Sequence, residues 1–332
     1  MSHHSTFLAQ KTVGDVLEEK PNQAPLVDIH VSTTVEKVFE TLLTYDFLSV
    51  PVYRIFNNVK DYVAIIDAYD LLSSIEERGI TEDSVTSPNE EFLAMPVAIL
   101  VGMTINSSKL WTCTPSTPLT QLIELFTKQR VHRVLVLEEI PVNTDEVDDE
   151  DIVPRQQPNG RLLSQTDVVR YLLANNHELG AILDVNADQI AGHALKYQET
   201  IDPNVIDQLK RNPITITIQD QALKALQLMA SSHASSIAVV DSTGALVAEM
   251  SAADLRGINP DRFKDLTKPV MVFLKSSKDS LRRPLSCRPR FSLGQIMSGV
   301  VRTHSHRSWL VDDEDRPVGC ISLSDILSVL LD

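Results

Sequence analysis

The chain repeats one pattern, in which two apolar runs flank a short turn and are followed by Ser or Thr with Asp three residues later. One copy runs from Ser235 to Asp254 and another from His306 to Asp325. These two copies have the same length and align without a gap. The number of repeats decides how many structural units share the chain. Two apolar runs around a turn predict a β-hairpin, and Ser/Thr-x-x-Asp predicts the start of a helix.

Two more copies lie in the first half of the chain. The copy from His132 to Asp167 carries 16 additional residues, and its insertion at 138–159 is acidic and contains proline. Such a composition predicts a solvated loop between two strands. In the first copy, which ends at Asp70, the turn is slightly longer and Asp67 replaces the Ser or Thr. The chain therefore contains four copies of one unit.

An amphipathic helix is predicted before each hairpin, since apolar residues recur there at helical spacing. The four predicted helices are Thr34–Tyr45, Pro118–Gln129, Gln221–Ser231 and Ser292–Arg302. Ser or Thr near the start is expected to cap the first, second and fourth of them, and Asp220 the third. A short extended segment precedes each helix, at Leu26–Val31, Leu110–Thr114, Ile214–Ile218 and Pro284–Cys287.

One unit is thus β-α-β-β-α, which places the chain in the α/β (α+β) class. A unit of this length buries little surface alone, so we expect the first unit to pair with the second and the third with the fourth. The predicted boundaries are 12–75, 92–175 (with the acidic loop 138–159), 184–258 and 263–331.

Composition and missing motifs argue against several classes of function. The net charge of −15 argues against binding to nucleic acid or to an anionic membrane, since both need a basic surface. Three cysteines without zinc-ligand spacing predict neither a disulfide framework nor a metal site. No signal peptide or membrane-spanning segment is predicted, so we expect the chain in the cytoplasm, the nucleus or both. The sequence lacks a P-loop, a dinucleotide-binding glycine motif and the common hydrolase motifs, and an enzyme is not expected.

A β-α-β-β-α unit with Ser/Thr-x-x-Asp opening its last helix resembles the CBS domain. Four such units resemble the γ subunit of AMP-activated protein kinase and its relatives of the yeast Snf4, plant γ-like and Sds23 types. The fourth unit carries the likeness best, through His306-Arg307 and the run from Gly319 to Asp325, and the second follows with His132-Arg133. The first and third units have Leu48-Ser49 and Ser235-Ser236 at the His-Arg position. The resemblance implies four CBS units paired into two Bateman modules, which together form a disc.

The resemblance also implies where adenosine ligands bind. It assigns the ribose to the carboxylates at the helix starts, namely Asp70, Asp167, Asp254 and Asp325. It assigns phosphate and hydroxyl contacts to His132, Arg133, Ser164, Thr166, Ser251, His306, Arg307, Ser322 and Ser324. Arginine suits phosphate because its guanidinium is a planar, permanently charged fork, and free N–H groups at a helix start suit it as well.

Two structural interpretations of the same residues stay open. Ser/Thr-x-x-Asp is also the sequence with which a helix caps its own start. The His-Arg pairs are equally able to form salt bridges with the surface of an acidic protein. The first unit is expected to bind phosphate most weakly, because Asp67 adds a second carboxylate there.

The resemblance implies one of two functions. The first is a non-catalytic regulatory protein that binds AMP, ADP or ATP between paired CBS units and regulates a kinase through its catalytic and scaffold subunits. The alternative is an interaction scaffold of the Sds23 type, which regulates a phosphatase or kinase without binding a nucleotide. No cofactor besides the nucleotide is expected.

Overall fold

Four small sheets of identical topology form the framework of the molecule. The computed structural model describes residues 2–21, 25–79, 81, 90–138, 160–197, 213–277 and 283–332, so the predicted acidic loop lies outside the described residues except for Glu138. In each sheet a short strand pairs in parallel with the next strand, which pairs antiparallel with the third. The sheets are β1 (Ile29–His30), β2 (Ser49–Phe56) and β3 (Val59–Asp67); β4 (Thr112–Cys113), β5 (Arg133–Val136) and β6 (Arg161–Ser164); β7 (Thr215–Thr217), β8 (Ser236–Val240) and β9 (Leu246–Ser251); and β10 (Ser286–Cys287), β11 (Arg307–Val311) and β12 (Pro317–Ser322).

A helix crosses between the first two strands of every unit, as a parallel strand pair requires. These helices are α3 (Val35–Thr44), α7 (Leu119–Lys128), α11 (Ala222–Ser231) and α14 (Leu293–Thr303), close to the predicted ranges. Their apolar stripes are buried, as at Val35, Val38, Phe39 and Leu42 of α3. The β-α-β-β-α prediction is confirmed up to this point in all four units.

The last helix of the unit forms in three units and is cut short in the third. It is α4 (Ala68–Glu77), α8 (Gln165–Ala174) and α15 (Leu323–Val329), but only the 3-10 turn η5 (Ala252–Leu255) in the third unit. Gly257, at φ +69°, and Pro260 follow that turn. A glycine in this conformation ends a helix, and Pro260 is the first residue of a separate helix, α12 (Pro260–Lys264), so the prediction of a full helix there is wrong.

Two of the predicted helix caps are also wrong. Thr34 and Ser292 accept the backbone N–H groups of Lys37 and Gln295, as expected. The residues that precede α7 and α11 are Pro118 and Gln221, and neither makes a side-chain cap. Asp220 instead accepts hydrogen bonds from Thr217 and Lys224.

Each unit is completed by a segment that belongs, in sequence, to its neighbour. The backbone N–H of Gly14 in α2 (Val13–Glu18) donates to the carbonyl of Pro115 ahead of α7, and Val97 in η1 (Val97–Leu100) donates to Thr33 ahead of α3. The same exchange joins the third and fourth units, through α9 (Ala187–Ile190) and the residues before α13 (Val270–Ser277). The first two units are thus interlocked, and so are the last two. The predicted unit boundaries stay a prediction.

The remaining helices of the described chain are short. They are α1 (His3–Ala9), α6 (Glu90–Ala94), η2 (Asn176–Glu178), η3 (Gly180–Asp184), η4 (His193–Tyr197), α12 (Pro260–Lys264) and η6 (Asp265–Thr267). No helix among the described residues has the length and apolar character needed to cross a bilayer.

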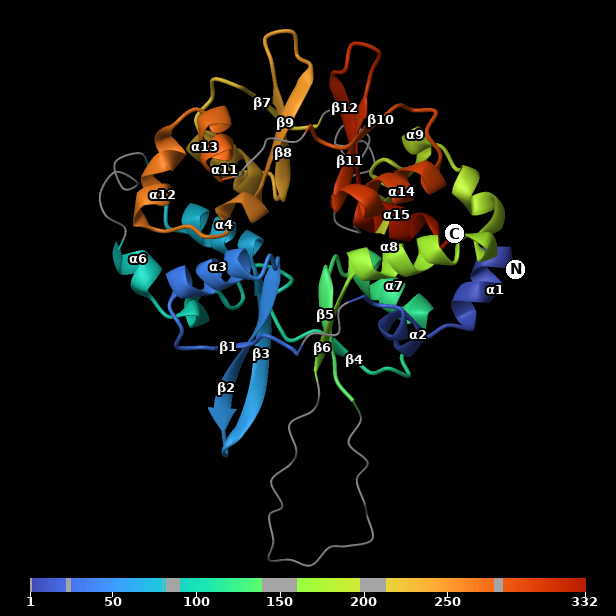
Figure 1. The fold of residues 1–332 in the computed structure, drawn as a ribbon, viewed down its shortest axis with the longest axis horizontal. Helices are drawn as coiled ribbons and strands as arrows, with labels where there is room; N and C mark the ends of the chain where they lie inside the picture. Colours follow the sequence, from blue (N-terminus) through green and yellow to red (C-terminus); the bar gives the residue numbers. More distant parts are fainter. Residues whose placement is uncertain are drawn as a thin grey trace, which may run out of the picture.

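Two apolar cores join the first interlocked pair of units to the second. One core contains α3, α4 and α11, from the first and third units, and the other contains α7, α8, α14 and α15, from the second and fourth units. A smaller cluster joins the sheets of the third and fourth units through Ala238, Leu246, Trp309 and Val311. In Figure 1 the strands lie in the middle of the molecule and the helices lie on either side. Four units therefore surround one centre, as the predicted disc requires.

Two of the cysteines occupy equivalent positions in the second and fourth units. Cys113 on β4 and Cys287 on β10 hold equivalent places, opposite Val136 on β5 and Leu310 on β11. All three cysteines are free thiols, and burial raises the pKa of Cys113 and of Cys320 to about 12. Thiols with such pKa values are poor nucleophiles at neutral pH, so they act as small packing residues.

Candidate nucleotide sites

The predicted ribose carboxylates all form helix-capping contacts. In the second, third and fourth units, Oδ2 of Asp167, Asp254 and Asp325 accepts both the backbone N–H and the hydroxyl of the Ser three residues earlier. In the first unit Asp70 accepts the backbone N–H of Asp67. The hydroxyls of Ser164, Ser251 and Ser322 are therefore used locally as well. Capping is thus a real role of these residues, whatever their other role.

Asp70 is enclosed by its own chain. Its side chain is fully buried, and Oδ1 accepts hydrogen bonds from Thr104 Oγ1 at 2.7 Å and Ser107 Oγ at 2.6 Å. Burial, followed by the neighbouring Asp67 carboxylate, raises the pKa of Asp70 to about 8. A carboxyl group in this state holds its proton at neutral pH and is already supplied with donors. The geometry favours the expectation that the first unit is the weakest site.

Asp167 is shared between capping and an ion pair. Lys20, from the segment that the first unit exchanges, places Nζ 3.0 Å from Oδ2, and Arg170 approaches Oδ1 at 3.5 Å. A cavity of about 230 Å³ adjoins this pair and is lined in part by Val16, Glu19 and Tyr171. The carboxylate therefore lies at the wall of a cavity, but with a cation of its own chain beside it.

Asp325 is held by a segment far away in sequence. The backbone N–H of Ala194 in η4 donates to its Oδ1 at 2.9 Å. Burial raises the pKa of Asp325, while hydrogen bonds from Ser322 act in the opposite direction. Asp254 differs, because Arg262 Nη2 binds the backbone carbonyl of Asp254, at 3.1 Å.

The two His-Arg pairs meet at the middle of the molecule. Burial, and after it the guanidinium groups of both pairs, lowers the pKa of His132 and of His306 to about 3. Such mutual influence requires that the second and fourth units place these side chains close together. Arg256 of the third unit acts on the same groups. We call His132, Arg133, Arg256, His306 and Arg307 the central cluster.

The arginines of the central cluster have carboxylate and hydroxyl partners within the protein. Arg133 Nη1 lies 3.7 Å from Asp67 Oδ2, and Arg307 Nη2 donates to Ser235 Oγ at 2.9 Å. Arg307 Nε lies 3.4 Å from Glu249 Oε1. Asp67 and Ser235 come from the first and third units, so all four units contribute to this region. Arg256 Nη1 donates to Asp46 Oδ1 at 2.8 Å, so each of the three guanidinium groups has a carboxylate partner in the chain.

The other two predicted hydroxyls differ in their surroundings. Ser324 Oγ accepts a hydrogen bond from Nε2 of Gln165 at 3.0 Å, which joins the fourth unit to the second. Thr166, next to Gln165, is half-buried.

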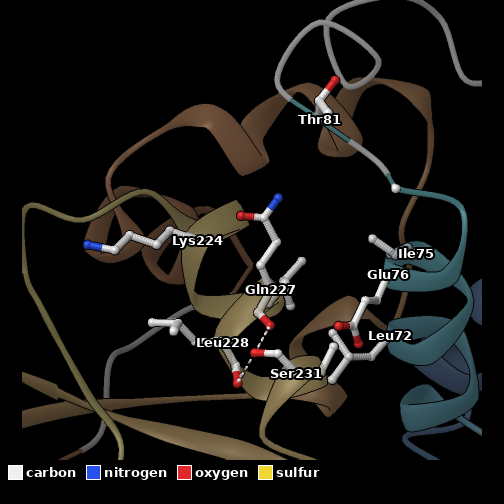
Figure 2. A pocket seen from close by; sticks show the side chains of 11 residues that line it. Leu72, Ile75, Glu76, Thr81, Lys224, Gln227, Leu228 and Ser231 are labelled. Atoms are coloured by element: carbon white, nitrogen blue, oxygen red, sulfur yellow. Dashed lines mark hydrogen bonds between the residues drawn. The ribbon is translucent and has the colours of Figure 1, made fainter.

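A larger cavity lies elsewhere, between the first and third units. It has a volume of about 370 Å³ and is bounded by α4 and α11, with Leu72 and Ile75 on one side and Leu226 and Leu228 on the other. Figure 2 shows Glu76, Lys224 and Gln227 around it. It contains none of the predicted ribose or phosphate residues.

Several site residues were not predicted from the sequence. Lys20, Arg256 and Ala194 lie outside the repeated pattern, on exchanged segments or after the shortened helix. Thr104 and Ser107, which enclose Asp70, lie in the second unit ahead of its first strand, β4. Alignment of the repeats cannot find such residues, because they are not repeated.

The fold and part of the sequence match known proteins. A family model described as CBS domain matches residues 101–143 and 279–332. The 5'-AMP-activated protein kinase subunit gamma of Saccharomyces cerevisiae is 24% identical over 328 residues, which cover 98% of this chain and 91% of the relative. The SNF1-related protein kinase regulatory subunit gamma-like PV42b of Arabidopsis thaliana is 21% identical over 82% of this chain and 76% of its own length.

The chain is also similar to a further yeast protein and to a solved archaeal structure. Protein SDS23 of Yarrowia lipolytica is 23% identical over 92% of this chain and 64% of the relative. The crystal structure of protein MJ1225 from Methanocaldococcus jannaschii superposes with a TM-score of 0.62 at 17% identity, covering 92% of this chain and 96% of that one. At that identity the structural match shows a shared fold and nothing more.

Proposed function

We propose that the chain is a non-catalytic regulator of the CBS-domain type that binds adenine nucleotides and acts on a partner kinase. A CBS-domain model matches part of the chain, and the chain is similar over most of its length to γ-type kinase regulatory subunits and to Sds23. The relatives with kinase names are described as regulatory or γ subunits. One of these kinases is named for its activation by 5'-AMP. The proposal carries both properties, ligand and partner, over to this chain.

The observation that carries the proposal is the central cluster. A nucleotide phosphate needs fixed cations, and arginine holds phosphate oxygens in a planar, bidentate geometry. Arg133, Arg256 and Arg307 come from three different units, and two neutral histidines lie among them. The predicted ribose carboxylates begin helices in the same units. A nucleotide with its ribose at one helix start and its phosphates at the cluster would contact at least two units.

Such a ligand would act by favouring one arrangement of the units. A ligand shifts a conformational equilibrium only by its difference in affinity for the two states. Contacts to two or more units supply that difference, and a bound kinase subunit would respond to the arrangement. In this proposal the four units have the predicted boundaries, the protein acts in the cytoplasm or nucleus, and all catalysis lies in the partner.

A second candidate is an interaction scaffold of the same fold without a nucleotide. It is favoured by the contacts at the ribose carboxylates, because Asp70, Asp167 and Asp325 each accept hydrogen bonds from groups of the chain beyond the capping box. In that case the Arg–carboxylate contacts at the centre would be structural.

Calorimetric titration with AMP, ADP and ATP separates the two candidates. The regulatory candidate requires binding by the native protein, and a nucleotide at 100 times its Kd would add about 2.7 kcal/mol to the free energy of unfolding. Arg307→Ala is expected to weaken binding, while the matched control Arg302→Ala changes an exposed arginine of α14 and leaves it unaltered. If none of the three nucleotides binds, the regulatory candidate is excluded and the interaction scaffold remains. Co-purification of kinase catalytic and scaffold subunits tests the partner.

A further inference from the structure

We propose that η4 (His193–Tyr197), here named the latch segment, closes the Asp325 carboxylate and must leave before a nucleotide ribose binds there. This inference rests on the proposed function, since it concerns the control of one of its sites. The latch segment packs against α15 and α7. Its Ala194 N–H donates to Asp325 Oδ1 at 2.9 Å, while Ser322 supplies Oδ2 with two hydrogen bonds. Each oxygen of the carboxylate therefore already accepts a hydrogen bond from the chain.

The latch contact and a ribose contact exclude each other. A ribose hydroxyl and a peptide N–H are both neutral hydrogen-bond donors. Oδ1 keeps one lone pair beside the Ala194 bond, so the two donors compete for the space in front of the carboxylate. Asp325 is only 6% exposed, which leaves little room for a second donor from solvent or ligand. The Ala194 peptide group thus takes the position that a ribose hydroxyl would need.

His193 fastens the latch segment to α15. Its Nδ1 lies 2.7 Å from Ser328 Oγ, and the single hydroxyl proton of Ser328 is donated to the carbonyl of Asp325 at 2.8 Å. Nδ1 must therefore carry a hydrogen and donate it to Ser328. Nε2 lies 3.0 Å from Asp332 Oδ2 and 3.2 Å from Lys196 Nζ, and Lys196 also pairs with Asp332. Two side chains thus tie the segment to the end of the chain.

The latch segment can open without disturbing the core. The preceding residues Ala187, Ile190 and Ala191 are buried in the core of the second and fourth units. No residue of the latch segment is fully buried. Gly192, at φ +64°, lies between the two parts and allows a change of chain direction that other residues resist. Segments with few buried apolar contacts open at low free-energy cost, so the latch is suited to release.

The test compares the native protein with the double variant His193→Ala/Lys196→Ala. Loss of the two fastening contacts is expected to lower the Kd for AMP about five- to tenfold, since less latch interaction must be broken. The matched control His177→Ala/Lys264→Ala removes an exposed histidine and an exposed lysine away from Asp325 and leaves the Kd unchanged. Adding Asp325→Asn to the latch variant is expected to abolish the gain.

Hydrogen exchange gives a second readout on the native protein. Binding of AMP is expected to speed amide exchange across 193–197 while residues 187–191 keep their protection. Equal Kd values for the native and latch proteins, with Asp325→Asn still weakening binding, would overturn the latch and leave nucleotide binding intact. Unchanged exchange across 193–197 under saturating AMP would overturn it too. If neither protein binds any of the three nucleotides, the proposed function fails and the latch has no ligand to control.

Discussion

Replacement of Asp70 by Asn should change how stability depends on pH. The pKa of Asp70 is raised from 3.8 to about 8, because the group is buried and lies beside Asp67. An acid whose pKa is higher in the folded state does not lower the free energy of unfolding at a pH below the unfolded pKa, because both states are then protonated. Between pH 4 and 8 the unfolded chain releases the proton and the folded protein keeps it, so stability falls as pH rises.

The size of the effect follows from the same shift. Each pH unit in that window costs about 1.4 kcal/mol, so Asp70 alone lowers the free energy of unfolding by about 4 kcal/mol between pH 4 and pH 7. Asn cannot ionise, so the free energy of unfolding of the variant lacks this dependence on pH. The amide also fits the site, because the hydroxyls of Thr104 and Ser107 can turn to accept its N–H groups, and Ser107 Oγ lies 3.4 Å from the carbonyl of Leu100.

Urea unfolding of the native and Asp70→Asn proteins at pH 5 and pH 8 measures the difference. The variant is expected to lose clearly less stability between the two pH values than the native protein. Asp167→Asn is the matched control, since it removes the equivalent carboxylate beside Lys20 and should destabilise by about 1 kcal/mol at pH 8. Parallel pH profiles for the native and Asp70→Asn proteins would refute the reasoning.

Two further changes test the site and the packing. Arg307→Ala should raise the Kd for AMP by about tenfold or more, as expected for a lost charge-assisted hydrogen bond, whereas Asp70→Ala should change it little; equal losses in calorimetric titrations would contradict this ranking. Gly257→Ala should destabilise by about 2 kcal/mol or more in urea unfolding, because Gly257 has φ +69° and a Cβ there would lie 2.3 Å from Leu43 Cδ2. Gly79→Ala, at φ +60° with open space, is its control and should cost about 1 kcal/mol.

The repeated elements were predictable because their residues carry a local pattern. Apolar runs around a turn and apolar residues at helical spacing led to the four sheets and the four crossing helices. The predicted caps of α7 and α11 were wrong because Pro118 and Gln221, and not the neighbouring polar residues, directly precede these helices. The predicted last helix of the third unit was wrong because Gly257, which follows its only turn, lies beyond the aligned pattern.

The site was predictable only in part. The resemblance to CBS proteins singled out the His-Arg pairs, and the fold brings them together from two units. Contacts such as Lys20 with Asp167 or Ala194 with Asp325 join residues more than a hundred positions apart. They depend on how exchanged segments cross between units, and no periodicity in the sequence records that crossing.

The crossing of these segments also constrains how a chain of this kind can lengthen or shorten in evolution. Deletion of a single unit would expose the apolar surface that its exchanged segment covers in the neighbouring unit. The exchanged segment of that neighbour would in turn have no unit to pack against. Insertions and deletions that take the units two at a time avoid that defect. Inheritance should therefore act on doublets, and an odd number of units would need a second chain to supply the missing cover.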